Sequence, residues 1–117
     1  MAQGGETRRT APLGGARMKE ARHELAAAFA RLSSAEEVEQ AFVDFLTVSE
    51  QRDLYSRWMI FKLLEQGMTQ RDISKLLGVS LCKITRGSRF LKSSKTIVKR
   101  MLAASSEKEK KANEDGV

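Results

Sequence analysis

The sequence contains few of the residues that build strands, disulfides or membrane spans. It has one cysteine, one proline, one tryptophan and one tyrosine among 117 residues. Cys82 has no second cysteine to pair with, and small secreted domains usually carry several paired cysteines, so we expect a reducing, cytoplasmic setting. No apolar run approaches the roughly 20 residues that span a bilayer. The dominance of Leu, Ala, Lys and Glu over β-branched and aromatic residues predicts an all-α fold.

Catalytic and metal-binding sets of residues are also missing. The one histidine, His23, follows Arg22 on the expected polar side of a helix, as a solvated surface residue would. We find no Ser-His-Asp set, no metal-ligand spacing and no glycine-rich phosphate loop. The sequence therefore predicts a protein that is not an enzyme and that has no catalytic residues, no metal and no cofactor.

Negative charge is nearly absent from one long segment. The whole chain carries a formal charge of +6, but residues 70–100 hold nine basic side chains and one acidic side chain, Asp72. That segment is therefore +8 and the rest of the chain is −2. A field of one sign costs self-repulsion unless a polyanion neutralises it, whereas a solvated face usually mixes both signs. We interpret the segment as a surface that binds nucleic acid.

Two terminal segments have too few apolar residues to order themselves by burial. Residues 1–15 are expected to form a disordered N-terminal arm, and residues 105–117 a disordered charged tail. Between them, in residues 16–104, apolar spacing and capping residues predict six helices. The first three cover about 16–32, 35–45 and 48 to just before Gly67, with Ser34 and Thr47 at their N-terminal caps.

The apolar stripes on these first three helices predict a homodimer. A domain of about 90 ordered residues has too few elements to cover such stripes within one chain. Sharing a core with a second copy of the chain is the simplest way to bury them.

A helix-turn-helix is predicted at about residues 69–92. Thr69 caps its first helix, in which Ile73, Leu76 and Leu77 are expected to face inward. Gly78 makes the turn, because only glycine enters the left-handed region without strain. Ser80 caps a second helix, 81–92, which should bury Ile84, Gly87 or Ser88, and Leu91. This order of short helix, glycine turn and second helix is the layout of DNA-binding helix-turn-helix units.

The outward side chains of these two helices have the chemistry of DNA contacts. In a recognition helix the first turns meet base edges, where Arg and Lys donate to guanine, Thr donates or accepts, and apolar tips touch thymine methyl groups. The helix before it presents its first turn to phosphates. The predicted DNA-binding residues are Gln70, Arg71, Leu81, Cys82, Lys83, Thr85, Arg86 and Lys92.

The stretch from Phe45 to Leu91 resembles the Trp repressor family. The resemblance rests on Leu46-Thr47, Ser56-Arg57-Trp58, Met68-Thr69-Gln70-Arg71, Leu77-Gly78 and, above all, Ile84-Thr85-Arg86-Gly87-Ser88 followed by Leu91-Lys92. It implies an intertwined homodimer that binds a double-stranded DNA operator and represses genes of tryptophan biosynthesis or transport. It also implies that L-tryptophan acts as the corepressor.

By position, the resemblance also implies a ligand site. Arg86 resembles the arginine that packs against the indole ring, and Arg57 resembles the one that clamps it from the opposite side. Leu46 and Thr47 resemble the pocket wall that the other subunit donates. The predicted ligand-binding residues are Leu46, Thr47, Arg57, Arg86, Gly87 and Phe90.

Two alternatives stay open. Phe90 stands where the family has a small hydroxyl residue near the corepressor ammonium, and a phenyl ring cannot hydrogen-bond to it. The chain could therefore be a Trp-repressor-like regulator with a different ligand or with none. In the second alternative, the basic helices belong to a protein-interaction module that binds an acidic partner.

Overall fold

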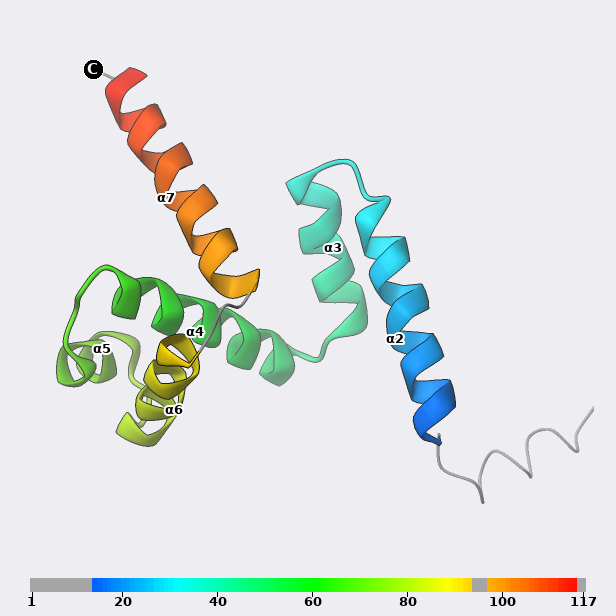
Figure 1. The fold of residues 1–117 in the computed structure, drawn as a ribbon, viewed down its shortest axis with the longest axis horizontal. Helices are drawn as coiled ribbons and strands as arrows, with labels where there is room; N and C mark the ends of the chain where they lie inside the picture. Colours follow the sequence, from blue (N-terminus) through cyan, green and yellow to red (C-terminus); the bar gives the residue numbers. More distant parts are fainter. Residues whose placement is uncertain (1–13, 94–96, 116–117) are drawn as a thin grey trace, which may run out of the picture. The chain divides into compact units, whose positions relative to one another are not determined.

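The fold consists of six α-helices, and the described residues contain no strand (Figure 1). The structure is a computed structural model that describes residues 14–93 and 97–115, with side chains up to Ser106. The helices are α2 (Gly15–Ala30), α3 (Ala35–Phe45), α4 (Val48–Glu65), α5 (Gln70–Leu77), α6 (Leu81–Lys92) and α7 (Ile97–Asp115). The predicted all-α fold is confirmed. Within the described residues, no helix is long and apolar enough to cross a membrane.

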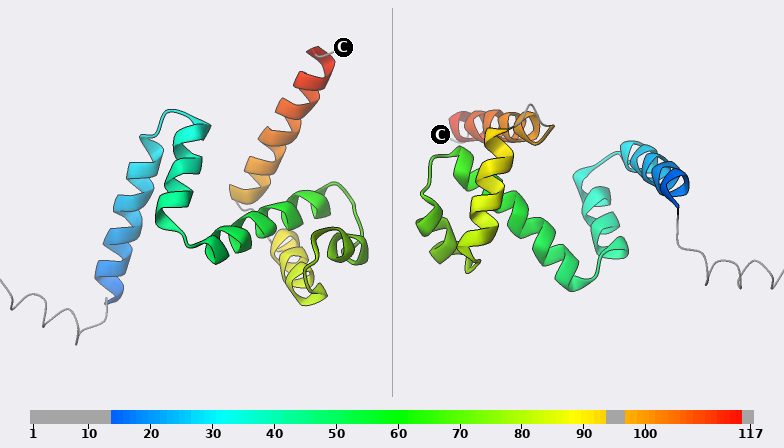
Figure 2. Two further views of the ribbon diagram at one scale, coloured as in Figure 1. Left: turned by 180° about the vertical axis from the view of Figure 1, so that it is seen from behind. Right: turned by 60° about the horizontal axis from the view of Figure 1, so that its bottom comes forward.

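The chain divides into two compact units, Met1–Leu46 and Thr47–Val117. The first unit contains α2 and α3, which lie side by side (Figures 1 and 2). The ring of Phe29 on α2 lies 6.0 Å from that of Phe42 and 6.1 Å from that of Phe45, both on α3. These aromatic contacts join the two helices. The first 13 residues of the predicted N-terminal arm lie outside the described residues.

The second unit contains α4 to α7 and holds the buried residues of the chain that the structure describes. One cluster joins α4, α5 and α6 through Ile60, Leu63, Ile73 and Ile84. A second cluster joins α4, α6 and α7 through Phe61, Leu91 and Leu102. Because α4 and α6 contribute to both clusters, they form the centre of this unit, and α6 crosses α4 in every view (Figures 1 and 2).

Local capping sets the helix starts as the sequence predicts. The Thr47 hydroxyl accepts from the Glu50 N–H at 3.1 Å, and the Glu50 carboxylate accepts from the Thr47 N–H at 2.8 Å, which completes a capping box. Ser34, Thr69 and Ser80 accept from backbone N–H groups at the starts of α3, α5 and α6. Each bond satisfies an N–H group that has no partner within its helix.

One expected core residue lies at the surface. Leu76 is 62% exposed rather than inward-facing, because α5 turns Ile73, Ser74 and Leu77 towards the core, and the Ser74 hydroxyl donates to the Val79 carbonyl at 2.7 Å. The predicted helical domain covers residues 16–104, and α7 extends to Asp115. Its last turns are rich in Glu, Lys and Ala, which favour helix without needing burial.

Gly78 gives a direct test of the turn between α5 and α6. It lies in the left-handed region at φ 67° and ψ 34°, and a Cβ built there would meet nothing within 4 Å. We therefore expect Gly78→Ala to lower the free energy of unfolding by about 1–2 kcal/mol through backbone strain alone. Gly78→Asn should lose less, because Asn tolerates this region. Urea unfolding followed by circular dichroism measures both, and an Ala variant as stable as the wild type would contradict the turn geometry.

Candidate functional site

The residues predicted as a helix-turn-helix fold into α5, a turn at Gly78 and α6. Ile73 on α5 and Ile84 on α6 are both fully buried, with 0% exposure, and they pack in one cluster. The hydrogen bond from Ser74 to the Val79 carbonyl closes the turn from inside. Because both helices are fixed by buried contacts on the same side, their opposite sides face solvent together.

Six of the eight predicted DNA-binding residues are exposed, namely Arg71, Leu81, Cys82, Lys83, Arg86 and Lys92. Leu81, Cys82 and Lys83 are exposed in the first turn of α6, and Arg71 is exposed in the first turn of α5. Lys92 is exposed at the other end of α6.

Gln70 and Thr85 join the starts of the two helices. The Thr85 hydroxyl donates to Gln70 Oε1 at 2.9 Å, and both side chains are half-buried. This bond links a predicted phosphate contact on α5 to a predicted base contact on α6.

Positive charge covers the described part of the basic segment. Eight of its nine basic side chains are exposed, namely Arg71, Lys75, Lys83, Arg86, Arg89, Lys92, Lys99 and Arg100. The ninth, Lys95, lies outside the described residues. Lys83 has a counter-charge, because its Nζ lies 3.7 Å from Oδ1 of Asp53 on α4. Both side chains of this pair are more than half exposed, so the ion pair is a weak one.

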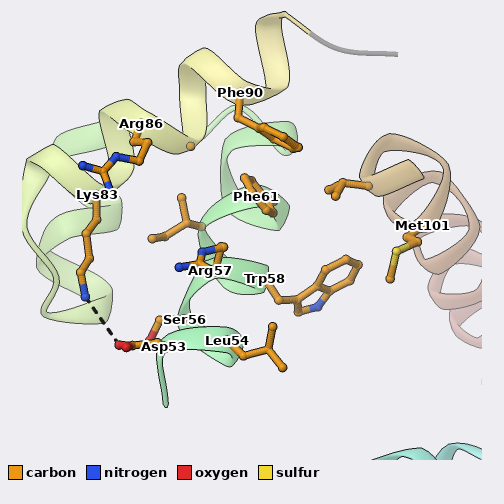
Figure 3. A pocket seen from close by; sticks show the side chains of 13 residues that line it. Asp53, Leu54, Ser56, Arg57, Trp58, Phe61, Lys83, Arg86, Phe90 and Met101 are labelled. Carbon is orange, nitrogen blue, oxygen red and sulfur yellow. Dashed lines mark ion pairs between the residues drawn. The ribbon is translucent and has the colours of Figure 1, made fainter. Parts of the chain in front are cut away.

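A cavity of about 570 Å³ lies within the second unit, between α4, α6 and α7 (Figure 3). Its volume falls within the roughly 300–1,000 Å³ of sites that hold small molecules. The residues that line it are Asp53, Leu54, Ser56, Arg57, Trp58, Ile60, Phe61, Lys83, Arg86, Gly87, Phe90, Val98 and Met101.

The cavity has a charged end and an apolar end. Figure 3 shows the charged groups of Asp53, Arg57, Lys83 and Arg86 on one side and the side chains of Leu54, Trp58, Phe61, Phe90 and Met101 on the other. A molecule that matches these walls has an ionised group at one end and an apolar, aromatic-sized body at the other. Such an arrangement orients a ligand as well as holding it.

Gly87 and Phe90 define the wall that α6 contributes. Gly87 is buried, and a Cβ built there would lie 3.0 Å from Ile60 Cγ2 and 3.6 Å from Phe61 Cε1, so a larger residue would crowd Ile60 where α6 approaches α4. One turn further on, the Phe90 ring stacks on Phe61 with centroids 5.4 Å apart. Phe90 stays 41% exposed. The phenyl ring therefore lies against the wall and leaves the cavity open.

Four of the six predicted ligand-binding residues come together in this cavity: Arg57, Arg86, Gly87 and Phe90. Leu46 is the C-terminal cap of α3 and belongs to the first unit. Thr47 caps α4 at the start of the second unit.

Sequence reasoning missed several other lining residues. Asp53 had a usable signal, because its spacing of four residues from Arg57 puts both on one face of a helix. Val98 and Met101 on α7 had no such signal in the sequence, because their position at the cavity depends on how α7 packs against α4 and α6.

The family model described as Trp repressor protein matches residues 20–106, more than half of the chain. The chain belongs to the Trp repressor family. This family consists of regulators, which confirms the prediction that the chain is not an enzyme.

Curated relatives match the central part of the chain. A Trp operon repressor homolog of Chlamydia trachomatis is 46% identical over 56 residues, which cover 47% of this chain and 60% of the relative. A homolog of Chlamydia caviae is 42% identical over 69 residues, covering 55% and 68%. A homolog of Aliivibrio fischeri is 51% identical over 49 residues, covering 41% and 45%. The chain thus spans about three fifths of the Chlamydia trachomatis relative. No solved structure matches the chain.

Proposed function

We propose that the chain is a sequence-specific transcriptional repressor that binds double-stranded DNA through α5 and α6. The observation that carries this proposal is the set of eight exposed basic side chains on α5, α6 and α7, in a segment with no acidic residue between Ile73 and Arg100. Phosphates would neutralise this field and release their counterions. Family membership supports the same function, since the matching relatives are named Trp operon repressor homologs.

The two helices would make different kinds of contact with DNA. Leu81, Cys82, Lys83 and Thr85 lie in the first turns of α6, where a recognition helix meets base edges. Arg86 would also reach base edges from these turns, and Gln70, Arg71 and Lys92 would contact the phosphate backbone. Phosphate contacts set the position of the protein on the duplex, and base contacts set the sequence preference.

The protein would act as a homodimer. In the single chain, Phe45 is 64% exposed and Met18, Val43 and Val48 are also more than half exposed. Apolar side chains exposed in such numbers mark surfaces that another chain covers. A two-fold dimer would also present two copies of α6 to successive major grooves, as helix-turn-helix regulators do.

L-tryptophan is the proposed corepressor. Its carboxylate matches the charged end of the cavity, where Arg57 and Arg86 lie, and its indole matches the apolar end. To raise the affinity for DNA, the ligand must bind the DNA-competent state more tightly than the other state. The stacking of Phe90 on Phe61 favours the alternative of a different ligand or none, because a wall already packed by protein can hold α6 in place without a ligand.

The first test concerns DNA recognition, on a duplex selected by the wild type from a random library. Lys92→Ala should weaken binding equally on the selected and a random duplex and lower the log–log salt slope by roughly 0.9. Lys83→Ala and Thr85→Ala should cost roughly 1–3 kcal/mol on the selected duplex and relax its sequence preference. Lys19→Ala, an exposed lysine on α2, is the charge control. If Lys83→Ala and Thr85→Ala weakened binding to the selected duplex and to the random duplex by the same factor, as Lys92→Ala should, α6 would not be the recognition helix.

The second test concerns assembly. Light scattering should give about twice the chain mass of 13.1 kDa at micromolar concentration. Phe45→Glu should shift the mass towards the monomer, because it puts a charge into the surface that the partner covers. Glu39→Gln, an exposed polar change on the same helix, should leave the dimer intact. A wild type with the mass of one chain would refute the dimer.

The third test concerns the corepressor. Gel shifts with and without millimolar L-tryptophan should show tighter DNA binding with the ligand, by a factor in the usual range of about 5–150 for coupled sites. Arg86→Ala should abolish this response and also weaken DNA binding, because Arg86 takes part in both proposed sites. Arg89→Ala, an exposed arginine on the same helix, should keep the response. Wild-type affinity that stays constant across the titration would support the alternative without tryptophan.

A further inference from the structure

Asp53 holds a distinctive position in the cavity. It lies on α4, one turn before Arg57, and its Oδ1 is 3.7 Å from the Nζ of Lys83 on α6. Among the described residues that line the cavity, it alone carries a negative charge, beside the three cations Arg57, Lys83 and Arg86. Its carboxylate points to the same charged end of the cavity as those cations (Figure 3).

This charge pattern suits a molecule that carries both a carboxylate and an ammonium group. The carboxylate of such a molecule can pair with the guanidinium groups, which bind carboxylates in two-pronged fashion. Its ammonium group needs an anionic acceptor, because three cations surround it. Phe90 and Phe61 offer no oxygen or nitrogen to that group. Among the described lining residues, the Asp53 carboxylate is the one anionic acceptor, whereas the Ser56 hydroxyl is neutral.

In the structure the Asp53 carboxylate already forms an ion pair with an ammonium group, that of Lys83. The Lys83 side chain is 56% exposed and that of Asp53 is 60% exposed. Exposed ion pairs of this kind are weak, so a competing ammonium group that is also held through its own carboxylate can replace Lys83.

We infer that Asp53 receives the ammonium group of an amino-acid ligand in exchange for that of Lys83. The inference rests on the proposed function, in which the cavity holds an amino acid and Lys83 contacts DNA. Without a ligand, the Asp53 carboxylate neutralises a cation in the first turn of α6. With the ligand bound, Lys83 is released and its charge becomes available to DNA. Asp53 is then the residue that makes the cavity prefer an amino acid to a carboxylic acid of the same shape that lacks the amino group.

Calorimetric titration without DNA tests the binding half of this exchange. L-tryptophan is compared with indole-3-propionate, which keeps the indole and the carboxylate but lacks the ammonium group. We expect Asp53→Asn to weaken L-tryptophan binding about tenfold, because a charged hydrogen bond is lost. The same variant should strengthen the binding of indole-3-propionate, because the repulsion between two carboxylates is removed. These changes of opposite sign separate loss of the ammonium site from general damage to the cavity.

Two further variants control this titration. Glu65→Gln makes the same charge change at an exposed position of α4 that does not line this cavity, and it should leave both affinities unchanged. Asp53→Glu keeps a carboxylate and should keep the preference for L-tryptophan. Equal effects of Asp53→Asn on the two ligands, or no effect on L-tryptophan, would overturn the inference.

Gel shifts test the release of Lys83. Without ligand, Asp53→Asn should bind DNA more tightly than the wild type, and L-tryptophan should add less to that affinity. In a protein that already carries Lys83→Met, adding Asp53→Asn should give little further gain in DNA affinity. If the gain persists without Lys83, the exchange is overturned and the effect belongs to the general field of the carboxylate.

The outcomes also separate this inference from the proposed function. Suppose that the wild type binds DNA and responds to L-tryptophan, and that Asp53→Asn binds L-tryptophan as tightly as the wild type does. This result would overturn only the inference. A wild type that binds DNA but ignores L-tryptophan in both assays would overturn the inference together with the corepressor assignment. A wild type that binds no DNA would overturn the repressor function, while the calorimetric comparison would still decide whether Asp53 holds the ammonium group.

Discussion

The close approach of α6 to α4 at Gly87 is the contact on which the rest of the second unit depends. A side chain at this position would press on Ile60, so the absence of one lets the two helices cross at short range. Ile84 and Leu91, one turn before and one turn after Gly87, are buried by the same crossing. One face of α6 is thereby committed to the core, and Cys82, Lys83 and Arg86 are exposed.

The centre of the unit is α4, because consecutive residues of this helix serve different neighbours. Ile60 packs with α5 and α6, whereas Phe61 packs with α6 and α7. Arg57 lies one turn earlier on α4 and lines the cavity between these neighbours. The cavity and the solvent side of α6 thus share one scaffold. Arg86 and Lys83 line the cavity and also lie on the exposed part of that helix, so the proposed ligand and DNA sites have side chains in common.

The sequence predicted what local chemistry determines and missed what packing determines. The caps at Thr47, Thr69 and Ser80 rest on contacts between residues three apart, and all three are present. Leu76 looked as apolar as Leu77, and only the rotation of α5 against its neighbours distinguishes them. In the cavity, Arg57, Arg86, Gly87 and Phe90 followed from the family resemblance. Met101 could not follow from any pattern, because its place depends on the packing of a separate helix. DNA binding, dimerisation and the tryptophan site stay predictions.

The position of Cys82 has a practical consequence. It is the one cysteine of the chain, and it is exposed in the first turn of α6 with a free thiol. Exposed thiols react readily with maleimide and iodoacetamide reagents once they ionise. A fluorophore or spin label will therefore attach to this 117-residue chain at a single, known position. No engineered cysteine is needed to place a spectroscopic reporter on α6.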